Sequence, residues 1–203
     1  MKLSEAADRL NSSSPDLPAL IFLTDQARVP DIGAVATTLP AGSAIILRDY
    51  TAPNRQKIAR DLAKLAQQRD LVLLIGSDVK LADAVGADGV HFREQDLVSH
   101  VDEVTRKIKS VTGRKKFIVT TAAHSAAALQ RAADVGANAA LLSPVFTTAS
   151  HPDTTPLGLA QFAALAAAAA LPVYALGGID EENVKHLLTT KAIGIAAISA
   201  LAG

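Results

Sequence analysis

The stretch Leu71–Phe92, LVLLIGSDVKLADAVGADGVHF, contains the pattern that decides the fold. An unbroken apolar run, Leu71–Ile75, is followed by a helical segment that ends at Gly86, and a second apolar run, Gly89–Phe92, begins directly afterwards. Short apolar runs that alternate with longer segments rich in Ala, Leu and charge are typical of β–α units. Strands that are apolar throughout, without alternation, indicate a parallel sheet buried on both faces.

The same pattern recurs along the chain of 203 residues. RAADVGANAALL, Arg131–Leu142, repeats the helix end, the glycine and the strand, and Gly86 and Gly136 suit left-handed helix ends. A helix is expected from Asn54, because Pro53 is a start signal. Strands are predicted at Leu20–Thr24, Ala44–Arg48, Leu71–Ile75, Gly89–Phe92, Phe117–Thr120, Ala139–Ser143, Pro172–Leu176 and Ile193–Ile198.

Eight β–α units close naturally into a (β/α)8 TIM barrel, for which a length of about 200 to more than 400 residues is usual. No linker or shift of composition indicates a second domain. We therefore expect residues 1–203 to form a single α/β domain, a compact TIM barrel with almost no helix after Ser199.

The composition excludes several classes of function. Lys plus Arg and Asp plus Glu are both 20, so no basic field would attract nucleic acid. Cys is absent, which excludes thiolate chemistry and agrees with a reducing compartment. The start MKLSEAADRL lacks the apolar stretch of a signal peptide. The longest apolar run, Phe162–Leu176, is broken by Pro172 and is shorter than the roughly 18 residues of a membrane span.

We therefore expect a soluble, cytoplasmic protein whose partner is a small molecule, with no binding to nucleic acid or to membranes. The sequence leaves open whether the barrels pair into a homo-oligomer, because no stripe of residues marks an interface.

The stretch VYALGGIDEEN, Val173–Asn183, places Gly177 and Gly178 directly after the seventh strand. In a parallel barrel, functional loops gather at the carboxyl ends of the strands, and those after strands seven and eight often hold phosphate. Glycine lets main-chain N–H groups approach an anion, Asp180 suits the start of the next helix, and Ser199 after the eighth strand adds a hydroxyl. The alternative is that the glycines only form a tight turn. Their placement beside Ser199 favours phosphate binding.

Several blocks then carry a resemblance to a known family. LSPVFTTASHPDTTPLGL (Leu142–Leu159), YALGGIDEENV and the terminal AAISAL resemble thiamin phosphate synthases and thiazole tautomerases, as do IFLTD, ILRDY and DVKLADAVGADGVHFREQDL (Asp78–Leu97). The resemblance covers most of the chain and implies a role in thiamine biosynthesis, with a thiazole phosphate as ligand. It implies that the phosphate is held by Thr148, Ser150, Gly177, Gly178, Ile198 and Ser199.

The chain departs from this family on the side of the second substrate. The synthase joins the thiazole to a pyrimidine methyl diphosphate and expels pyrophosphate, and the family pattern after strand two is Gln-x-Arg-x-Lys. Here Arg48 remains, whereas Ile46 and Tyr50 replace the glutamine and the lysine. The family also has Asn-Asp after strand three, whose Asp holds magnesium, but Gly76 and Ser77 stand here.

The second magnesium carboxylate of the family corresponds to Asp96. A serine hydroxyl is a poor substitute for a carboxylate, because Mg²⁺ prefers anionic oxygen in octahedral geometry. Arg93 and His151 could supply positive charge without a metal. We therefore expect a degenerate magnesium site with Arg93, Asp96 and His151 on the diphosphate side, and neither a bound metal nor another cofactor.

The stretch TTAAHS, Thr120–Ser125, places His124 where the tautomerase branch of the family has a histidine that shuttles protons. An imidazole can both accept and return a proton, as moving a ring double bond requires. The alternative is that His124 merely opens a surface helix. His91 ends a strand and either points into the barrel mouth or packs, His100 and His186 are expected to be solvated, and no spacing indicates zinc.

Three classes of function follow from these residues. The first is a thiazole tautomerase, an isomerase with His124 and Arg48 as catalytic residues, and the sequence places it ahead. The second is the synthase, a transferase with a remodelled diphosphate pocket. The third is a non-catalytic barrel that binds thiazole or thiamin phosphate. An unrelated phosphosugar isomerase is a weaker fourth, since a fold alone does not determine chemistry.

Overall fold

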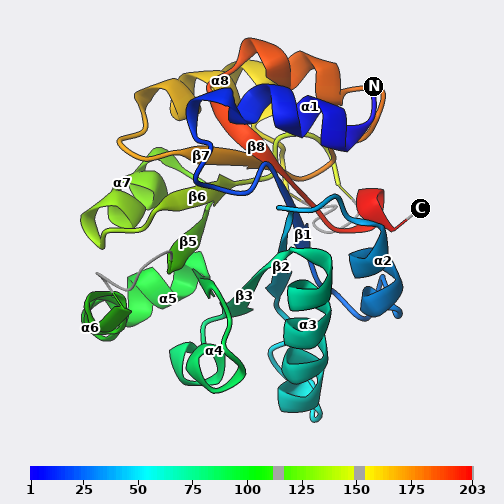
Figure 1. The fold of residues 1–203 in the computed structure, drawn as a ribbon. Coiled ribbons are helices and arrows are strands. Elements are labelled where there is room, and N and C mark those ends of the chain that lie inside the picture. Colours follow the sequence, from blue (N-terminus) through cyan, green and yellow to red (C-terminus); the bar gives the residue numbers. More distant parts are fainter. Residues whose placement is uncertain (112–116, 149–153, 203) are drawn as a thin grey trace.

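A computed structural model describes residues 1–111, 117–148 and 154–202 of the chain (Figure 1). Eight parallel strands pair in chain order, and the sheet closes because β1 pairs with both β2 and β8. The predicted TIM barrel is confirmed. The strands are β1 (Leu20–Leu23), β2 (Ala44–Leu47), β3 (Val72–Gly76), β4 (Gly89–Phe92), β5 (Ile118–Ala123), β6 (Ala139–Leu142), β7 (Val173–Leu176) and β8 (Ala192–Ala197).

The observed strand bounds differ little from the predicted ones, and β5 shows the largest difference. It continues from Thr120 to Ala123, because these residues pair with the whole length of β6, Ala139–Leu142. The sequence pattern missed this extension, since it ends in Ala122 and Ala123 and alanine is depleted in strands.

Helices surround the barrel in the expected order (Figure 1). They are α1 (Leu3–Leu10), η1 (Asn11–Ser13), α2 (Ile32–Thr38), α3 (Arg55–Arg69), α4 (Val79–Val85), α5 (Glu94–Ser99), α6 (Val101–Val111), α7 (Ala126–Asp134), α8 (Gly158–Ala168), η2 (Val184–Thr189) and η3 (Ser199–Leu201), the η segments being 3-10 helices. Gly86 and Gly136 have φ of 67° and 79° after α4 and α7, as predicted.

The helices predicted after Asp180 and after Ser199 can be compared with the structure. The Asp180 carboxylate accepts hydrogen bonds from the N–H groups of Glu182 and Asn183, so it forms a turn, and the short η2 begins only at Val184. The helix predicted directly after Asp180 is therefore replaced by a turn and a 3-10 helix. The predicted near-absence of a last helix is confirmed, because η3 has only three residues.

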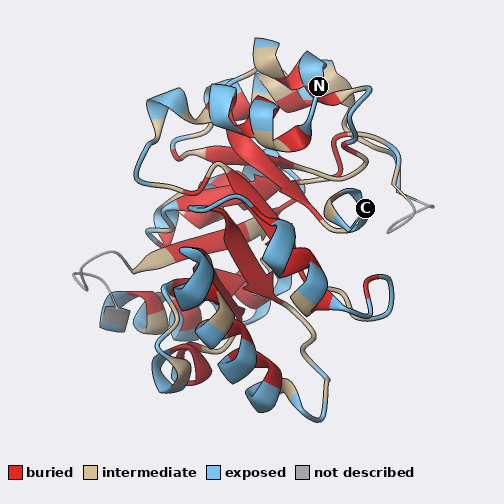
Figure 2. Cartoon of the chain, turned by 45° about the vertical axis from the view of Figure 1, so that its right-hand side comes forward, coloured by how far each residue is buried: buried red, intermediate tan, exposed pale blue. Residues whose placement is uncertain are grey.

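Apolar side chains fill two layers, one inside the barrel and one between the barrel and the helices. Ile21, Leu23 and Tyr174 belong to the inner layer, while Phe22 and Ile45 from the same sheet belong to the outer one. Both layers are excluded from solvent, and the strands are buried while the outer faces of the helices are exposed (Figure 2). This two-sided burial explains why most of the strands are apolar on both faces.

The amino end of the barrel is covered by the segment around α1. Asn11 donates a hydrogen bond from Nδ2 to the carbonyl of Ile193 over 3.0 Å, and the buried Tyr174 hydroxyl donates to the carbonyl of Pro18 over 2.7 Å. The loops at the carboxyl ends of the strands lie at the opposite mouth. Among the described residues, no helix has both the length and the apolar character that crossing a membrane requires.

Candidate functional site

A cavity of about 730 Å³ opens at the carboxyl ends of the strands. Its lining includes Arg48 after β2, Arg93 after β4, His124 after β5 and Gly177 after β7. Residues distant in the sequence meet here because the strands of a parallel barrel all end at one face. The volume lies within the range of about 300–1,000 Å³ that is typical of small-ligand sites.

A side compartment of about 280 Å³ joins this cavity beneath the loops after β6, β7 and β8. The two share Arg28, Thr148 and Gly177 among their lining residues, so they lie next to each other. The described residues that the sequence predicted for phosphate binding all line this compartment: Thr148, Gly177, Gly178, Ile198 and Ser199. Ser150, the remaining predicted residue, lies outside the described residues.

Glycine is required at positions 177 and 178 because the loop after β6 packs closely against the main chain there. Gly177 and Gly178 have φ of 99° and 66°, which favours glycine. A Cβ at Gly178 would lie 2.3 Å from the carbonyl oxygen of Thr147, and the N–H of Phe146 donates to the carbonyl of Gly177 over 3.0 Å. Among the residues that the structure describes, the N–H groups of Gly178 and Ser199 have no acceptor. The bare main chain thus both admits the loop and leaves donors for an anion.

Two arginines share one carboxylate where the two spaces meet. Asp25 Oδ2 accepts from Arg48 at 3.3 Å and lies 2.9 Å from Arg28. The Arg48 Nε also donates to the carbonyl of Thr24 over 3.0 Å, which fixes the guanidinium plane. Burial lowers the pKa of Arg48, and neighbouring Tyr50 and Asp25 oppose that shift. Sequence reasoning missed Arg28, whose only signal was its position in the loop after the first strand.

Asp96, on the diphosphate side predicted from the sequence, is held inside the protein. Its Oδ2 accepts from the Ser77 hydroxyl over 2.5 Å, and its Oδ1 accepts from Arg93 Nη2 over 2.7 Å. Burial would raise the pKa of Asp96, but the hydrogen bonds from Arg93 and Ser77 outweigh it and hold the pKa below its ordinary value. Asp96 is therefore an ionised carboxylate that is already paired.

The Asp96 carboxylate does not fit a magnesium ion. Mg²⁺ needs carboxylate oxygens that are free to complete an octahedron, and both oxygens of Asp96 already accept from Arg93 and Ser77. Within residues 1–111, 117–148 and 154–202, no three His, Cys, Asp or Glu side chains gather in a way that could hold a metal. His151, predicted for the same side, lies outside the described residues.

His124 forms a pair with a carboxylate at the rim of the cavity. Its Nδ1 lies 2.6 Å from Glu94 Oε2, and Glu94 Oε1 accepts from Arg131 over 2.9 Å. A carboxylate oxygen accepts, so the tautomer of a neutral imidazole that fits this contact carries its proton on Nδ1 and leaves Nε2 as an acceptor. Half of the His124 side chain is exposed, which lets it meet a ligand. The sequence pointed to His124 but missed Glu94, which lies 30 residues away in the chain.

His91 faces the interior of the barrel below these groups. Its Nδ1 lies 2.9 Å from the hydroxyl of Thr120, and the side chain is almost wholly buried, although it reaches the cavity wall. Burial lowers the pKa of His91 from 6.5 to about 3, with the charge of Arg48 as a second cause. His91 is therefore neutral near neutral pH. His100 and His186 are exposed, as predicted.

The buried imidazole of His91 predicts a loss of stability in acid. Below pH 6.5 the unfolded chain binds a proton at His91, whereas the folded chain stays neutral until about pH 3. The free energy of unfolding should therefore fall as pH falls through this window, by up to about 1.4 kcal/mol per pH unit, and this contribution is constant above it. Urea unfolding between pH 7.5 and 4.5 should show a shallower acid slope in His91→Gln. The exposed control His186→Gln should keep the slope of the wild type; equal slopes in all three proteins would contradict the assignment.

The sequence of this chain is similar to those of known proteins. A family described as thiamine monophosphate synthase matches residues 20–201. A protein of Aquifex aeolicus provisionally named thiamine-phosphate synthase 2 is 34% identical over 91% of this chain and 97% of its own. A thiamine-phosphate synthase of Methanoculleus marisnigri is 34% identical over 89% of this chain and 80% of its own.

A solved structure agrees with these sequence matches. The thiamine phosphate pyrophosphorylase of Pyrococcus furiosus superposes with a TM-score of 0.76 at 26% identity, over 97% of this chain and 89% of that one. The structural similarity therefore extends over almost the whole chain.

Proposed function

Because the chain belongs to the thiamine monophosphate synthase family, we propose that it joins a phosphorylated thiazole to a pyrimidine methyl diphosphate and releases pyrophosphate. The observation that carries the proposal is that the main cavity, lined by the guanidinium groups of Arg48 and Arg93, lies next to the side compartment with its glycine pair. A tautomerase needs room for one ligand only. Together with the names of the relatives, this favours the transferase over the tautomerase that the sequence placed ahead.

The phosphate of the thiazole occupies the side compartment in this proposal. The N–H groups of Gly178 and Ser199 and the hydroxyls of Thr148 and Ser199 are suited to donate to its oxygens. Arg28 lines both spaces, so its charge reaches the anions on either side. Binding at this end orients the ring toward the main cavity, where the reaction takes place.

The diphosphate lies on the side of Arg48 and Arg93. A bond forms between the thiazole and the pyrimidine methylene carbon while the bond from that carbon to the diphosphate oxygen breaks, and the electron pair leaves with pyrophosphate. The negative charge that develops must be neutralised, and prepositioned guanidinium groups in a partly buried site do this well. Arg48 is prepositioned by Thr24 and Asp25, and Arg93 by Asp96.

The His124–Glu94 pair favours a second candidate function, proton transfer on the thiazole phosphate. The Nε2 of His124 can accept a ring proton and return it at another position, while Glu94 stabilises the imidazolium formed in between. This tautomerase activity needs the side compartment and His124 but neither Arg93 nor a second substrate.

One assay separates these functions. Purified protein is incubated with thiazole phosphate, with and without pyrimidine methyl diphosphate, while pyrophosphate is followed by a coupled enzyme assay and the thiazole by NMR. We expect pyrophosphate and thiamine phosphate to form in equal amounts only when both substrates are present.

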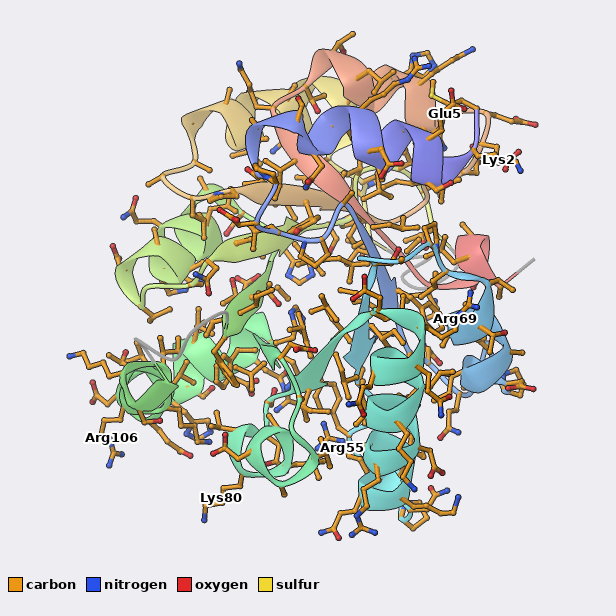
Figure 3. The ribbon with its side chains drawn as sticks, in the orientation of Figure 1. Lys2, Glu5, Arg55, Arg69, Lys80 and Arg106 are labelled. Carbon is orange, nitrogen blue, oxygen red and sulfur yellow. The ribbon has the colours of Figure 1, made fainter. Side chains whose placement is uncertain are left out.

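The other outcomes would identify the alternatives. Interconversion of thiazole tautomers without pyrophosphate, abolished in His124→Asn, would establish the isomerase and overturn the transferase. Binding of thiazole phosphate by calorimetry without either turnover would point to a non-catalytic binding protein. The control Arg106→Gln changes an exposed side chain on α6 that points away from the barrel (Figure 3) and should behave as the wild type.

A further inference from the structure

The Asp96 carboxylate receives more donors than a single ion pair would provide. Its Oδ1 accepts from Nε and Nη2 of Arg93, and its Oδ2 accepts from the main-chain N–H of Arg93, again from Nε, and from the hydroxyl of Ser77. A carboxylate offers about four lone-pair sites, so this one is saturated. Only about an eighth of the Asp96 side chain is exposed. It is thus closed to a further ligand.

The guanidinium of Arg93 is oriented by this contact and still faces the cavity. Its side chain is 40% exposed and lines the main cavity together with Arg48. The Nε and Nη2 atoms bond to Asp96, while Nη1 has no partner within the described parts of the chain. The hydrogen bonds that Arg93 donates to Asp96 raise the pKa of Arg93, so the group stays charged. A fixed cation with an unused donor is suited to bind an anionic ligand.

Tyr50 supports the same guanidinium from its flat side. The Arg93 guanidinium carbon lies 4.7 Å from the centre of the Tyr50 ring, and that of Arg55 lies 5.6 Å from it. Arg55, which extends from α3 toward α4 (Figure 3), is itself held by a 2.6 Å hydrogen bond to the carbonyl of Gly76. Cations near an aromatic ring centre are stabilised by its electron-rich face.

Gly76 packs closely against Tyr50, and Ser77 bonds to Asp96. A Cβ at Gly76 would lie 2.7 Å from a Tyr50 ring carbon, so the ring requires a glycine there. Ser77 has φ of 56°, which non-glycine residues rarely adopt, and its hydroxyl bonds to Asp96. Such backbone conformations persist where their surroundings hold them and are common at functional sites. Tyr50, Gly76, Ser77, Arg93 and Asp96 are therefore mutually dependent and form a built arrangement.

We propose that this arrangement makes Arg93 a direct ligand for a diphosphate group and lets the cavity bind that group without a divalent cation. The inference rests on the proposed function, of which it defines the diphosphate subsite. Arg93 acts as the anion ligand, while Asp96, Ser77 and Tyr50 are positioning residues that hold its guanidinium toward the cavity. Guanidinium groups match phosphate oxygens with two parallel hydrogen bonds, which gives affinity without a metal.

The test is a calorimetric titration of the protein with inorganic pyrophosphate, once with EDTA and once with Mg²⁺. We expect binding in EDTA, and no tighter binding with Mg²⁺, because Mg²⁺ also sequesters pyrophosphate in solution. Arg93→Gln should weaken binding in EDTA at least about tenfold, since it removes a charged donor. Arg93→Lys should recover part of the affinity, because it restores the charge without the planar fork.

Two controls accompany the pyrophosphate titration. Arg106→Gln removes an equal charge from α6 and should leave the affinity within about twofold, because exposed charges act weakly on distant sites. Thermal unfolding of each variant reports whether it is folded. Should Arg93→Gln not fold, the titration of the wild type with and without Mg²⁺ still decides. Binding of pyrophosphate only when Mg²⁺ is present, or unchanged affinity in a folded Arg93→Gln, would overturn the proposal.

The same proteins separate this inference from the proposed function. Pyrophosphate binding in EDTA without any formation of thiamine phosphate would support the subsite and overturn the transferase. Formation of thiamine phosphate that depends strictly on Mg²⁺ would support the transferase and overturn the subsite.

Discussion

Gly178→Ala is expected to lower the free energy of unfolding by about 3–5 kcal/mol and to weaken the binding of thiazole phosphate more than tenfold. Two causes add. A residue with φ of 66° costs an alanine about 1–2 kcal/mol, and the new Cβ would lie 2.3 Å from the Thr147 carbonyl and 2.7 Å from the Phe146 carbonyl. The loop after β6 must then move, and that loop places Thr148 in the wall of the side compartment.

Gly86→Ala is the matched control for this prediction. Gly86 has nearly the same φ, 67°, but a Cβ there meets nothing within 4 Å. Urea unfolding of the two variants therefore separates the cost of the backbone conformation, about 1–2 kcal/mol, from the cost of the clash. Calorimetry with thiazole phosphate should show wild-type affinity in Gly86→Ala. Equal losses of stability in the two variants would mean that the loop after β6 does not press on Gly178.

Arg48→Gln is expected to reduce kcat/KM for the proposed transfer about a thousandfold, with little change in the binding of thiazole phosphate. Arg48 is fixed by the Thr24 carbonyl and by Asp25, and it lines the main cavity without lining the side compartment. Its charge therefore acts on the diphosphate as that group leaves. Steady-state kinetics of pyrophosphate release checks the rate, and calorimetry checks the binding.

Arg48→Lys tests whether geometry matters in addition to charge. A lysine ammonium keeps the charge but cannot reproduce the planar contacts to Thr24 and Asp25, so we expect a loss of at least about tenfold. Arg69→Gln serves as a control, because within the described part of the chain Arg69 bonds only to the carbonyl of Thr37 at the end of α2. A folded Arg48→Gln that retained pyrophosphate release within threefold of the wild type would exclude Arg48 from the reaction.

The architecture was predictable because each strand carries its own signal. Ala44–Leu47 and Ala139–Leu142 are apolar on both faces, and the glycines after α4 and α7 have the positive φ that left-handed helix ends require. Such features depend on neighbours in the sequence, so the pattern reveals them. The extension of β5 to Ala123 was not predictable, because it depends on pairing with β6.

The candidate site likewise contains residues that the sequence indicated and residues that it did not. The glycine pair after β7 and His124 after β5 were visible as residues of the right type at the ends of predicted strands. Arg28, Tyr50 and Glu94 were missed, because nothing in their own segments indicates what they contact. Glu94 became significant only when the fold placed it 2.6 Å from His124, and Tyr50 only when its ring met the guanidinium of Arg93.

The sequence alone thus predicted the barrel and placed the glycine pair and Ser199, which line the side compartment, at the carboxyl ends of its strands, since apolar strands and glycine turns act through local physical constraints. The tertiary structure alone decided what each charged side chain pairs with. The resemblance matched Asp96 to a magnesium carboxylate of the family and the sequence predicted a degenerate site, but only the fold shows that Arg93 and Ser77 surround this carboxylate. The energy of a buried charge depends on the atoms around it, and those atoms come from distant parts of the chain.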